Sequence, residues 1–102
     1  MAGFVQIIEV KTSHPDELNA LATDFRAERS ASNEPMPVSR GIFTADRDRP
    51  GYFLNIVEFD SYEAAMANND SPSTTKFAAR LAELCDAPPK FYNLDLIDVW
   101  TR

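Results

Sequence analysis

Three short segments of this chain carry apolar side chains on both of their faces, which limits the fold more than any other feature. They are residues 4–11 (FVQIIEVK), 52–59 (YFLNIVEF) and 91–100 (FYNLDLIDVW). Each is rich in β-branched and aromatic residues and lies between turn-forming residues, which is typical of strands. A sheet with one face in water carries apolar residues mainly on its other face. Both faces of this sheet are therefore expected to be covered.

The segment after the first strand predicts a helix. His14 or Ser13 is the candidate N-cap, and Pro15 suits the first helical position. Four apolar residues then follow at i, i+3, i+4 and i+7, which places them on one helix face. These residues are Leu18, Leu21, Ala22 and Phe25. The pattern fades between Ser30 and Asn33, so the helix is expected to end there.

The second half of the chain predicts a hairpin, a divided helix and a last strand. Residues 38–44 form a strand that joins the strand 52–59 through the polar turn at 46–51. The capping-box spacing of Asp60 to Glu63 starts a short helix that reaches Ala67, and a longer helix restarts at Ser71-Pro72. The order is β-α-β-β-α-β, which predicts an α+β, ferredoxin-like fold with a four-stranded antiparallel sheet.

Helices on one face of this sheet leave the other face without a cover. The simplest second cover is the same face of another copy, so we expect a homodimer joined through the sheet face.

Composition limits the class of protein further. A chain of 102 residues is expected to be one domain, spanning 1–102. The longest apolar runs are two or three residues, so no membrane span is expected, and the first residues lack the features of a secretory leader. A single cysteine, Cys85, fits a reducing cytoplasm. The net charge of −6 argues against nucleic acid and membranes as partners.

Residues 55–66 (NIVEFDSYEAAM) carry a resemblance that covers residues 4–100. An aromatic residue ends a strand, and a Ser-x-Glu-Ala helix start, a short break and a second helical piece follow. In these features the chain resembles the dimeric α/β-barrel superfamily, which contains the antibiotic-biosynthesis-monooxygenase-like domains. The resemblance implies a small enzyme without metal or organic cofactor, an oxygenase of an aromatic or polyketide-like compound that reacts through a substrate enolate. A polyketide cyclase or isomerase, or a non-catalytic dimer that binds a small aromatic or hydrophobic ligand, is the alternative.

The resemblance also suggests catalytic residues. Asn55 lies in an otherwise apolar strand, and an amide there is costly unless it is hydrogen-bonded or functional. Cofactor-free oxygenases of this superfamily have an Asn, an aromatic residue four positions on and a helix Arg in the pocket, which correspond to Asn55, Phe59 and Arg80. His14 is the candidate base. The alternatives are a satisfied amide, a core Phe, a surface Arg and a helix-start His.

Departures from the superfamily pattern bear on activity. Phe59 stands where many members have Trp, and no His follows position 14, which disfavours haem degradation. One His and one Cys argue against a metal site, and three glycines form no phosphate loop.

The candidate substrate-binding residues are aromatic or polar and are spread along the chain. Asn69 belongs to the helix break at 68–73, which is expected to act as a gate over the pocket. The full set is Phe59, Tyr52, Tyr62, Asn69 and Trp100, each with core or interface packing as the alternative.

Other residues leave two interpretations open. Cys85 is expected to be a buried small hydrophobe rather than a reactive thiol. Three arginines could hold an acidic substrate group or face solvent, namely Arg26, Arg29 and Arg40. Three polar strand residues could face a cavity or an interface, namely Gln6, Asn93 and Asp95.

Overall fold

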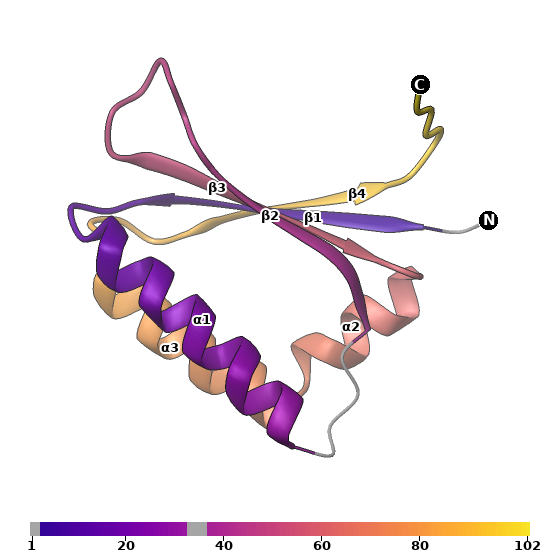
Figure 1. The fold of residues 1–102 in the computed structure, drawn as a ribbon, viewed down its shortest axis with the longest axis horizontal. Coiled ribbons are helices and arrows are strands. Elements are labelled where there is room, and N and C mark those ends of the chain that lie inside the picture. The colour runs from indigo at the N-terminus through magenta and orange to yellow at the C-terminus, as the bar shows by residue number, and fades with distance from the viewer. Residues whose placement is uncertain (1–2, 33–36) are drawn as a thin grey trace.

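The computed structural model describes residues 3–32 and 37–102, and Figure 1 shows a sheet with helices on one side. The elements are β1 (Phe4–Lys11), α1 (Pro15–Ala31), β2 (Val38–Ala45), β3 (Tyr52–Phe59), α2 (Tyr62–Asn69), α3 (Pro72–Leu84) and β4 (Lys90–Asp95). This order confirms the α+β, ferredoxin-like prediction, including the division of the second helix. Asn33, one of the residues expected at the end of the first helix, lies outside the described residues.

The four strands form one antiparallel sheet in the order β2-β3-β1-β4. Side chains alternate between its faces, so each cross-strand row belongs to one face. The row Ile8, Asn55, Phe43 faces the helices, whereas the row of Ile7 and Ile56 faces away from them. In Figure 1, α1 and α3 lie side by side below one half of the sheet, and α2 lies below the other half.

Two apolar clusters join the helices to the sheet. Phe4 and Phe59 pack with Ala65 of α2. Val10 packs with Leu18 of α1 and Leu81 of α3. The clusters correspond to the two halves of the helix layer. The pocket described below lies against the second cluster, since it shares these three residues.

The helix starts are fixed by hydroxyl groups. Ser61 is the N-cap of α2, and its side chain accepts a hydrogen bond from the Ala64 N–H at 3.0 Å, so the helix starts one residue later than the Asp60-to-Glu63 spacing predicted. His14 is the N-cap of α1, but its side chain makes no capping bond. Buried Thr12 serves this region instead: its hydroxyl accepts from the His14 N–H at 2.9 Å and donates to the Leu84 carbonyl. One side chain thus links the start of α1 to the end of α3.

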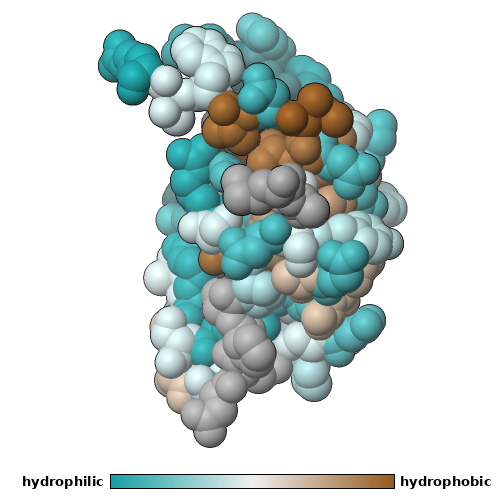
Figure 2. Space-filling view, turned by 90° about the vertical axis from the view of Figure 1, so that its right-hand side faces the viewer, coloured by the Kyte–Doolittle hydropathy of each residue, from teal (hydrophilic) through white to brown (hydrophobic). Residues whose placement is uncertain are grey.

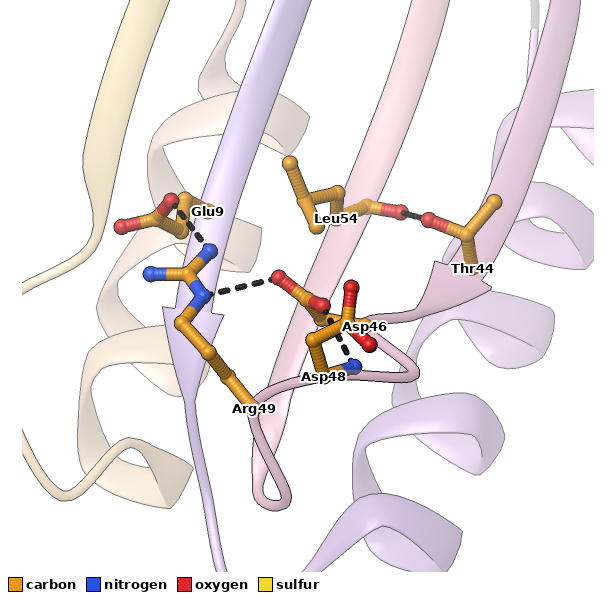
Figure 3. Close-up of polar contacts among 6 residues, drawn as sticks. All are labelled: Glu9, Thr44, Asp46, Asp48, Arg49 and Leu54. Atoms are coloured by element: carbon orange, nitrogen blue, oxygen red, sulfur yellow. Dashed lines mark hydrogen bonds and ion pairs between the residues drawn. The ribbon is translucent and has the colours of Figure 1, made fainter.

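The β2–β3 hairpin is held by charged side chains (Figure 3). Arg49 Nε donates to Asp46 at 2.8 Å, and Arg49 Nη2 donates to Glu9 of β1 at 3.0 Å. Gly51 has φ +88°, a conformation that strains residues with a Cβ. The Arg49 guanidinium holds the pKa of Asp46 below its usual value of 3.8.

The last strand is shorter than the sequence predicted. Residues 91–100 were expected to be extended in the sheet, but β4 ends at Asp95. Its partner β1 begins at Phe4, which pairs with Asp95, and one further bond joins the Leu96 N–H to the Gly3 carbonyl. Beyond that point the described chain offers β4 no neighbour. Figure 1 shows the tail rising on the side opposite the helices.

Candidate ligand pocket

A pocket lies between the sheet and the helices α1 and α3. Its cavity volume is about 50 Å³, which is enough for a few water molecules. Most of its lining is apolar: Ile8, Val10, Leu18, Ala22, Phe43, Phe77 and Leu81. Three polar side chains complete it: Asn19, Arg26 and Asn55. This composition is typical of small-molecule sites, which combine apolar walls with few polar groups.

The apolar stripe of α1 explains the position of the pocket. Leu18 is buried against Val10 and Leu81, which fixes the start of the helix to the sheet. One turn later the stripe holds Ala22, whose side chain is too short to fill the same space. Phe77 of α3 closes that side of the pocket and packs against Phe25 with ring centroids 4.7 Å apart.

Asn55 is the polar group of the sheet wall. It pairs with Ile8 on β1 and Phe43 on β2, and all three side chains line the pocket. Its side chain is half-buried and makes no hydrogen bond with any of the described residues. The amide is not fully desolvated, because its polar atoms are not among the buried, unpaired atoms of the described residues. The sequence left open an amide satisfied by neighbouring backbone, and the role of Asn55 in a pocket stays a prediction.

Asn19 and Arg26 form the exposed rim of the pocket. Both project from α1, seven residues apart and so on one face of the helix. Arg26 Nη2 donates to the Thr23 hydroxyl at 3.3 Å. The lining residues named above include no carboxylate, imidazole or thiol. The polar chemistry of the pocket is therefore hydrogen-bond donation, amide acceptance and one positive charge.

Phe43 forms part of the pocket wall on the edge strand β2. It is 43% exposed and stacks on Phe53 with centroids 5.8 Å apart and an angle of 14°. It is more exposed than Phe77, the other aromatic side chain of the lining. A flat aromatic molecule is larger than the space for a few waters.

The structure does not bring the three predicted catalytic residues together. Arg80 lines a second, smaller hollow of about 20 Å³ with Asp24, Glu28 and Lys76. His14 is exposed at the start of α1, with Nδ1 3.9 Å from Glu17 Oε1. Of the three, Asn55 alone lines the larger pocket. The catalytic roles of Arg80 and His14 stay predictions from sequence.

The predicted substrate-binding residues also lie apart. Phe59 is buried beside Phe4, and Tyr62 meets the same Phe4 ring edge-on at 5.4 Å. Tyr52 belongs to the opposite face of the sheet, where Arg49 lies 4.3 Å from its ring centroid. Asn69 is exposed on α2 and donates to Met66 Sδ at 3.9 Å, and Trp100 is 83% exposed in the tail. These five residues lie outside the pocket lining, and their binding roles stay predictions.

The helix break carries a polar connection that sequence reasoning missed. Arg29, 4% exposed, donates from Nη1 to the Thr74 hydroxyl, which in turn donates to the Asn68 side chain, both at 3.5 Å. Arg29 was treated as a surface or substrate-binding residue, yet it joins the end of α1 to the start of α3. The sequence could have indicated that Arg29 is buried, because Leu18, Ala22, Phe25 and Arg29 follow helical spacing and so share one face of α1.

The remaining polar candidates have simpler environments. Buried Gln6 donates to Asn93 at 3.1 Å, which links β1 and β4 on the helix side of the sheet. Arg40 pairs with Glu58 at 2.8 Å on the opposite side. Burial raises the pKa of the Cys85 thiol, which fits a packing role.

The described residues contain neither a metal-binding cluster nor a membrane-spanning helix. Residues 3–32 and 37–102 contain no group of three His, Cys, Asp or Glu side chains able to hold a metal ion. None of the described helices has the length and hydropathy needed to cross a membrane.

The element order, the sheet order and the helix-side pocket define a ferredoxin-like α+β protein. No family model matches the sequence, and no curated protein is similar to it. Solved structures do match. A candidate antibiotic biosynthesis monooxygenase from Caulobacter crescentus superposes with a TM-score of 0.78 and 16% identity, over 95% of this chain and 92% of that one.

Other solved structures give the same result. A candidate antibiotic biosynthesis monooxygenase from Deinococcus radiodurans gives a TM-score of 0.71 with 15% identity, over 97% of each chain. A conserved protein from Methanosarcina mazei gives 0.76 with 10% identity, over 92% of each chain. The chain therefore has the same fold as these solved structures, two of which are candidate antibiotic biosynthesis monooxygenases. This confirms the fold that the resemblance at residues 55–66 predicted.

Proposed function

We propose that the protein is a small cofactor-independent oxygenase of aromatic or polyketide-like compounds that reacts through a substrate enolate. The observation that carries this proposal is the half-buried Asn55 amide, which has no side-chain partner among the described residues and lies in an apolar, aromatic pocket. A donor held in such a place is ready to bind an oxygen on which negative charge develops.

The proposed reaction needs few protein groups besides this donor, because the substrate itself reacts with dioxygen. The substrate loses a proton from an activated carbon, and the resulting enolate gives one electron to dioxygen. The substrate radical and superoxide combine to a peroxide, which loses water to leave a carbonyl group. The Asn55 N–H would donate to the enolate oxygen and stabilise the charge before oxygen reacts.

The pocket lining restricts which substrates can react. Because the lining supplies no carboxylate, imidazole or thiol, the proton must leave a substrate that is already acidic. A phenolic compound whose enolate is conjugated with a carbonyl group has this property. Walls such as Phe43 and Phe77 would exclude water from the enolate, so that it stays available to oxygen.

The same lining supports a second candidate function. Without a base in the pocket, the protein could bind an aromatic ligand and catalyse nothing, and a cyclase or isomerase would use the enolate without oxygen. Oxygen consumption with 1,8-dihydroxyanthrone separates these functions. The oxygenase predicts uptake above that of heat-denatured protein and a loss of this excess in Asn55→Ala. Binding of the anthrone without excess uptake would contradict the oxygenase and favour the second candidate.

We also propose that the protein is a cytoplasmic homodimer joined through the open face of the sheet. Five apolar side chains of this face have no helix over them: Val5, Ile7, Ile42, Leu54 and Ile56. Figure 2 shows hydrophobic side chains gathered on the upper part of the molecule, where the C-terminal tail leaves the sheet. That tail exposes Ile97 (93%) and Val99 (63%).

A second copy is the partner that fits this surface. Two arginines on this side of the sheet are paired within the chain, Arg40 with Glu58 and Arg49 with Glu9. The five residues named above are apolar, and an identical face is complementary to them. The cytoplasmic location is supported by the lone thiol of Cys85, which needs no oxidising compartment.

A further inference from the structure

We infer that Arg26 determines substrate specificity by binding a carboxylate carried on the aromatic body of the ligand. The inference rests on the proposed function, since it takes the pocket of Asn55 as the ligand site. It adds a substrate class, flat aromatic carboxylates, and a residue that selects for them.

The side chain of Arg26 is available for such a contact. Helix geometry brings the residues three and four positions away next to it, and these are Ala22, Thr23, Arg29 and Ser30. None of them is an acid. Arg26 accordingly forms no ion pair with the described residues, and its Nη2 atom makes only the 3.3 Å bond to the Thr23 hydroxyl.

The acids of α1 do not compete for the guanidinium at the pocket. Asp24 and Glu28 line the second hollow, together with Arg80 and Lys76. Asp16 and Glu17 belong to the first turn of the helix, more than two turns before Arg26. The pocket lining itself contains no carboxylate. Arg26 is therefore a positive charge at the rim with no negative charge in the lining opposite it.

The rim is also chemically suited to a carboxylate. A guanidinium presents two parallel N–H donors that match the two carboxylate oxygens, and Asn19 adds an amide donor on the same helix face. The chain as a whole carries a net charge of −6, which repels anions at long range. Any preference of this protein for an anionic ligand must therefore come from a local cation, and Arg26 is the cation of the lining.

The pocket lining offers contacts to both parts of such a ligand. The apolar ring would contact Phe43 and Phe77, its carboxylate would bind Arg26, and an oxygen on the ring would accept from Asn55. The two polar groups would thus have different roles. Arg26 would bind the permanent charge of the carboxylate, and Asn55 would stabilise the charge that develops during the reaction. Ligands without a carboxylate would lose the first contact only.

The test compares two probes of one shape, 2-naphthoate and its neutral analogue 2-naphthamide. Each is titrated into the full-length protein, and dissociation constants are read from the side-chain amide signals of Asn55 in ¹H–¹⁵N NMR spectra. Wild type is expected to bind naphthoate about three- to tenfold more tightly, the range of a partly exposed charge-assisted pair. Arg26→Gln is expected to abolish this preference, because it weakens the binding of naphthoate more than that of naphthamide.

Arg47→Gln is the matched control. Arg47 is exposed in the hairpin, and its replacement changes the net charge by the same amount without touching the pocket. This variant is expected to keep the preference for naphthoate. Equal binding of both probes by wild type, a preference that survives in Arg26→Gln, or no binding of either probe would overturn the inference.

The outcome is separate from that of the proposed function. Tighter binding of naphthoate that depends on Arg26, without oxygen uptake on any phenolic substrate, would leave the specificity site in place and remove the oxygenase. Oxygen uptake that depends on Asn55, without a preference for naphthoate, would do the reverse.

Discussion

Asn55 and Phe43 are direct cross-strand partners on β3 and β2, and both side chains line the pocket under α1. The pair sets a polar side chain beside an aromatic ring of the pocket wall. Asn55 is half-buried, whereas Phe43 is 43% exposed. The roles that we propose for them, charge stabilisation by Asn55 and an aromatic wall at Phe43, can therefore be altered separately.

Replacement of Asn55 by Leu is expected to stabilise the protein and to remove its activity. The amide is half-buried and has no side-chain partner among the described residues, so an apolar side chain of similar size removes the cost of its partial desolvation. We expect the free energy of unfolding to rise by about 1 kcal/mol. Turnover of the anthrone should fall about ten- to a thousandfold if the amide stabilises the enolate. Denaturant unfolding and oxygen uptake measure the two effects.

Gln6→Leu is the control for this variant. Gln6 is a buried strand amide like Asn55, but it donates to Asn93 at 3.1 Å. Its loss leaves the Asn93 oxygen without that donor, so we expect a destabilisation of about 1 kcal/mol. If Asn55→Leu and Gln6→Leu changed stability in the same direction, the interpretation of Asn55 as a functional amide would be wrong.

Replacement of Phe43 by Ala is expected to open the pocket at little cost in stability. Phe43 is 43% exposed, whereas Phe59 is 4% exposed and packs in the cluster with Phe4. We expect Phe59→Ala to cost about 3–5 kcal/mol and Phe43→Ala about 1–2 kcal/mol. Phe43→Ala should also admit ligands larger than naphthamide, measured as a lower dissociation constant for an anthracene carboxamide. An unchanged affinity for the larger ligand would show that Phe43 does not limit the pocket.

The elements of the fold could be predicted from sequence because local chemistry specifies them. The capping-box spacing of Asp60 to Glu63 predicted a helix start within one residue of the observed N-cap, Ser61. The β-branched and aromatic residues 52–59 predicted β3 with its observed bounds. The end of β4 could not be predicted. Residues 96–100 look like a strand, yet their pairing depends on a neighbour that stops at Phe4. Sequence pattern does not show where a partner strand ends.

The site was harder to predict than the fold. Asn55 was identified because a polar residue in an apolar strand stands out, and it lies in the pocket. Arg26 and Arg80 look alike in sequence, since both are cations on helices. The rotation of each helix about its axis decides which arginine reaches the larger pocket. Arg26 lines that pocket, whereas Arg80 lines the second hollow. That choice depends on helix packing, which one sequence does not fix.

Charge at two neighbouring positions of β3 is expected to have two different effects. Ile56 lies on the open face of the sheet, whereas Val57 packs with Phe4 and Phe59 on the helix side. Ile56→Asp should dissociate the homodimer and leave the protomer folded. Val57→Asp should unfold the protomer, since a buried carboxylate costs several kcal/mol. Light scattering and circular dichroism distinguish the two results. A wild-type monomer at micromolar concentration would refute the homodimer.

The Asp46 carboxyl group in the β2–β3 hairpin is expected to titrate below its usual pKa. Arg49 Nε donates to Asp46 at 2.8 Å and the Asp48 N–H donates to it at 3.0 Å, and these bonds hold the pKa of Asp46 below its usual value of 3.8. A carboxylate with a lowered pKa contributes its stability above pH 3.8 and loses it as the pH falls through the lower, folded-state value. Carboxyl-carbon NMR should therefore give Asp46 a midpoint below 3.8 in wild type. Arg49→Gln should move the midpoint back toward 3.8, and Arg47→Gln should leave it unchanged, because the pKa of Asp46 is lowered by Arg49 and the Asp48 N–H and not by Arg47. A midpoint at or above 3.8 in wild type would show that the ion pair of Arg49 with Asp46 does not form in solution.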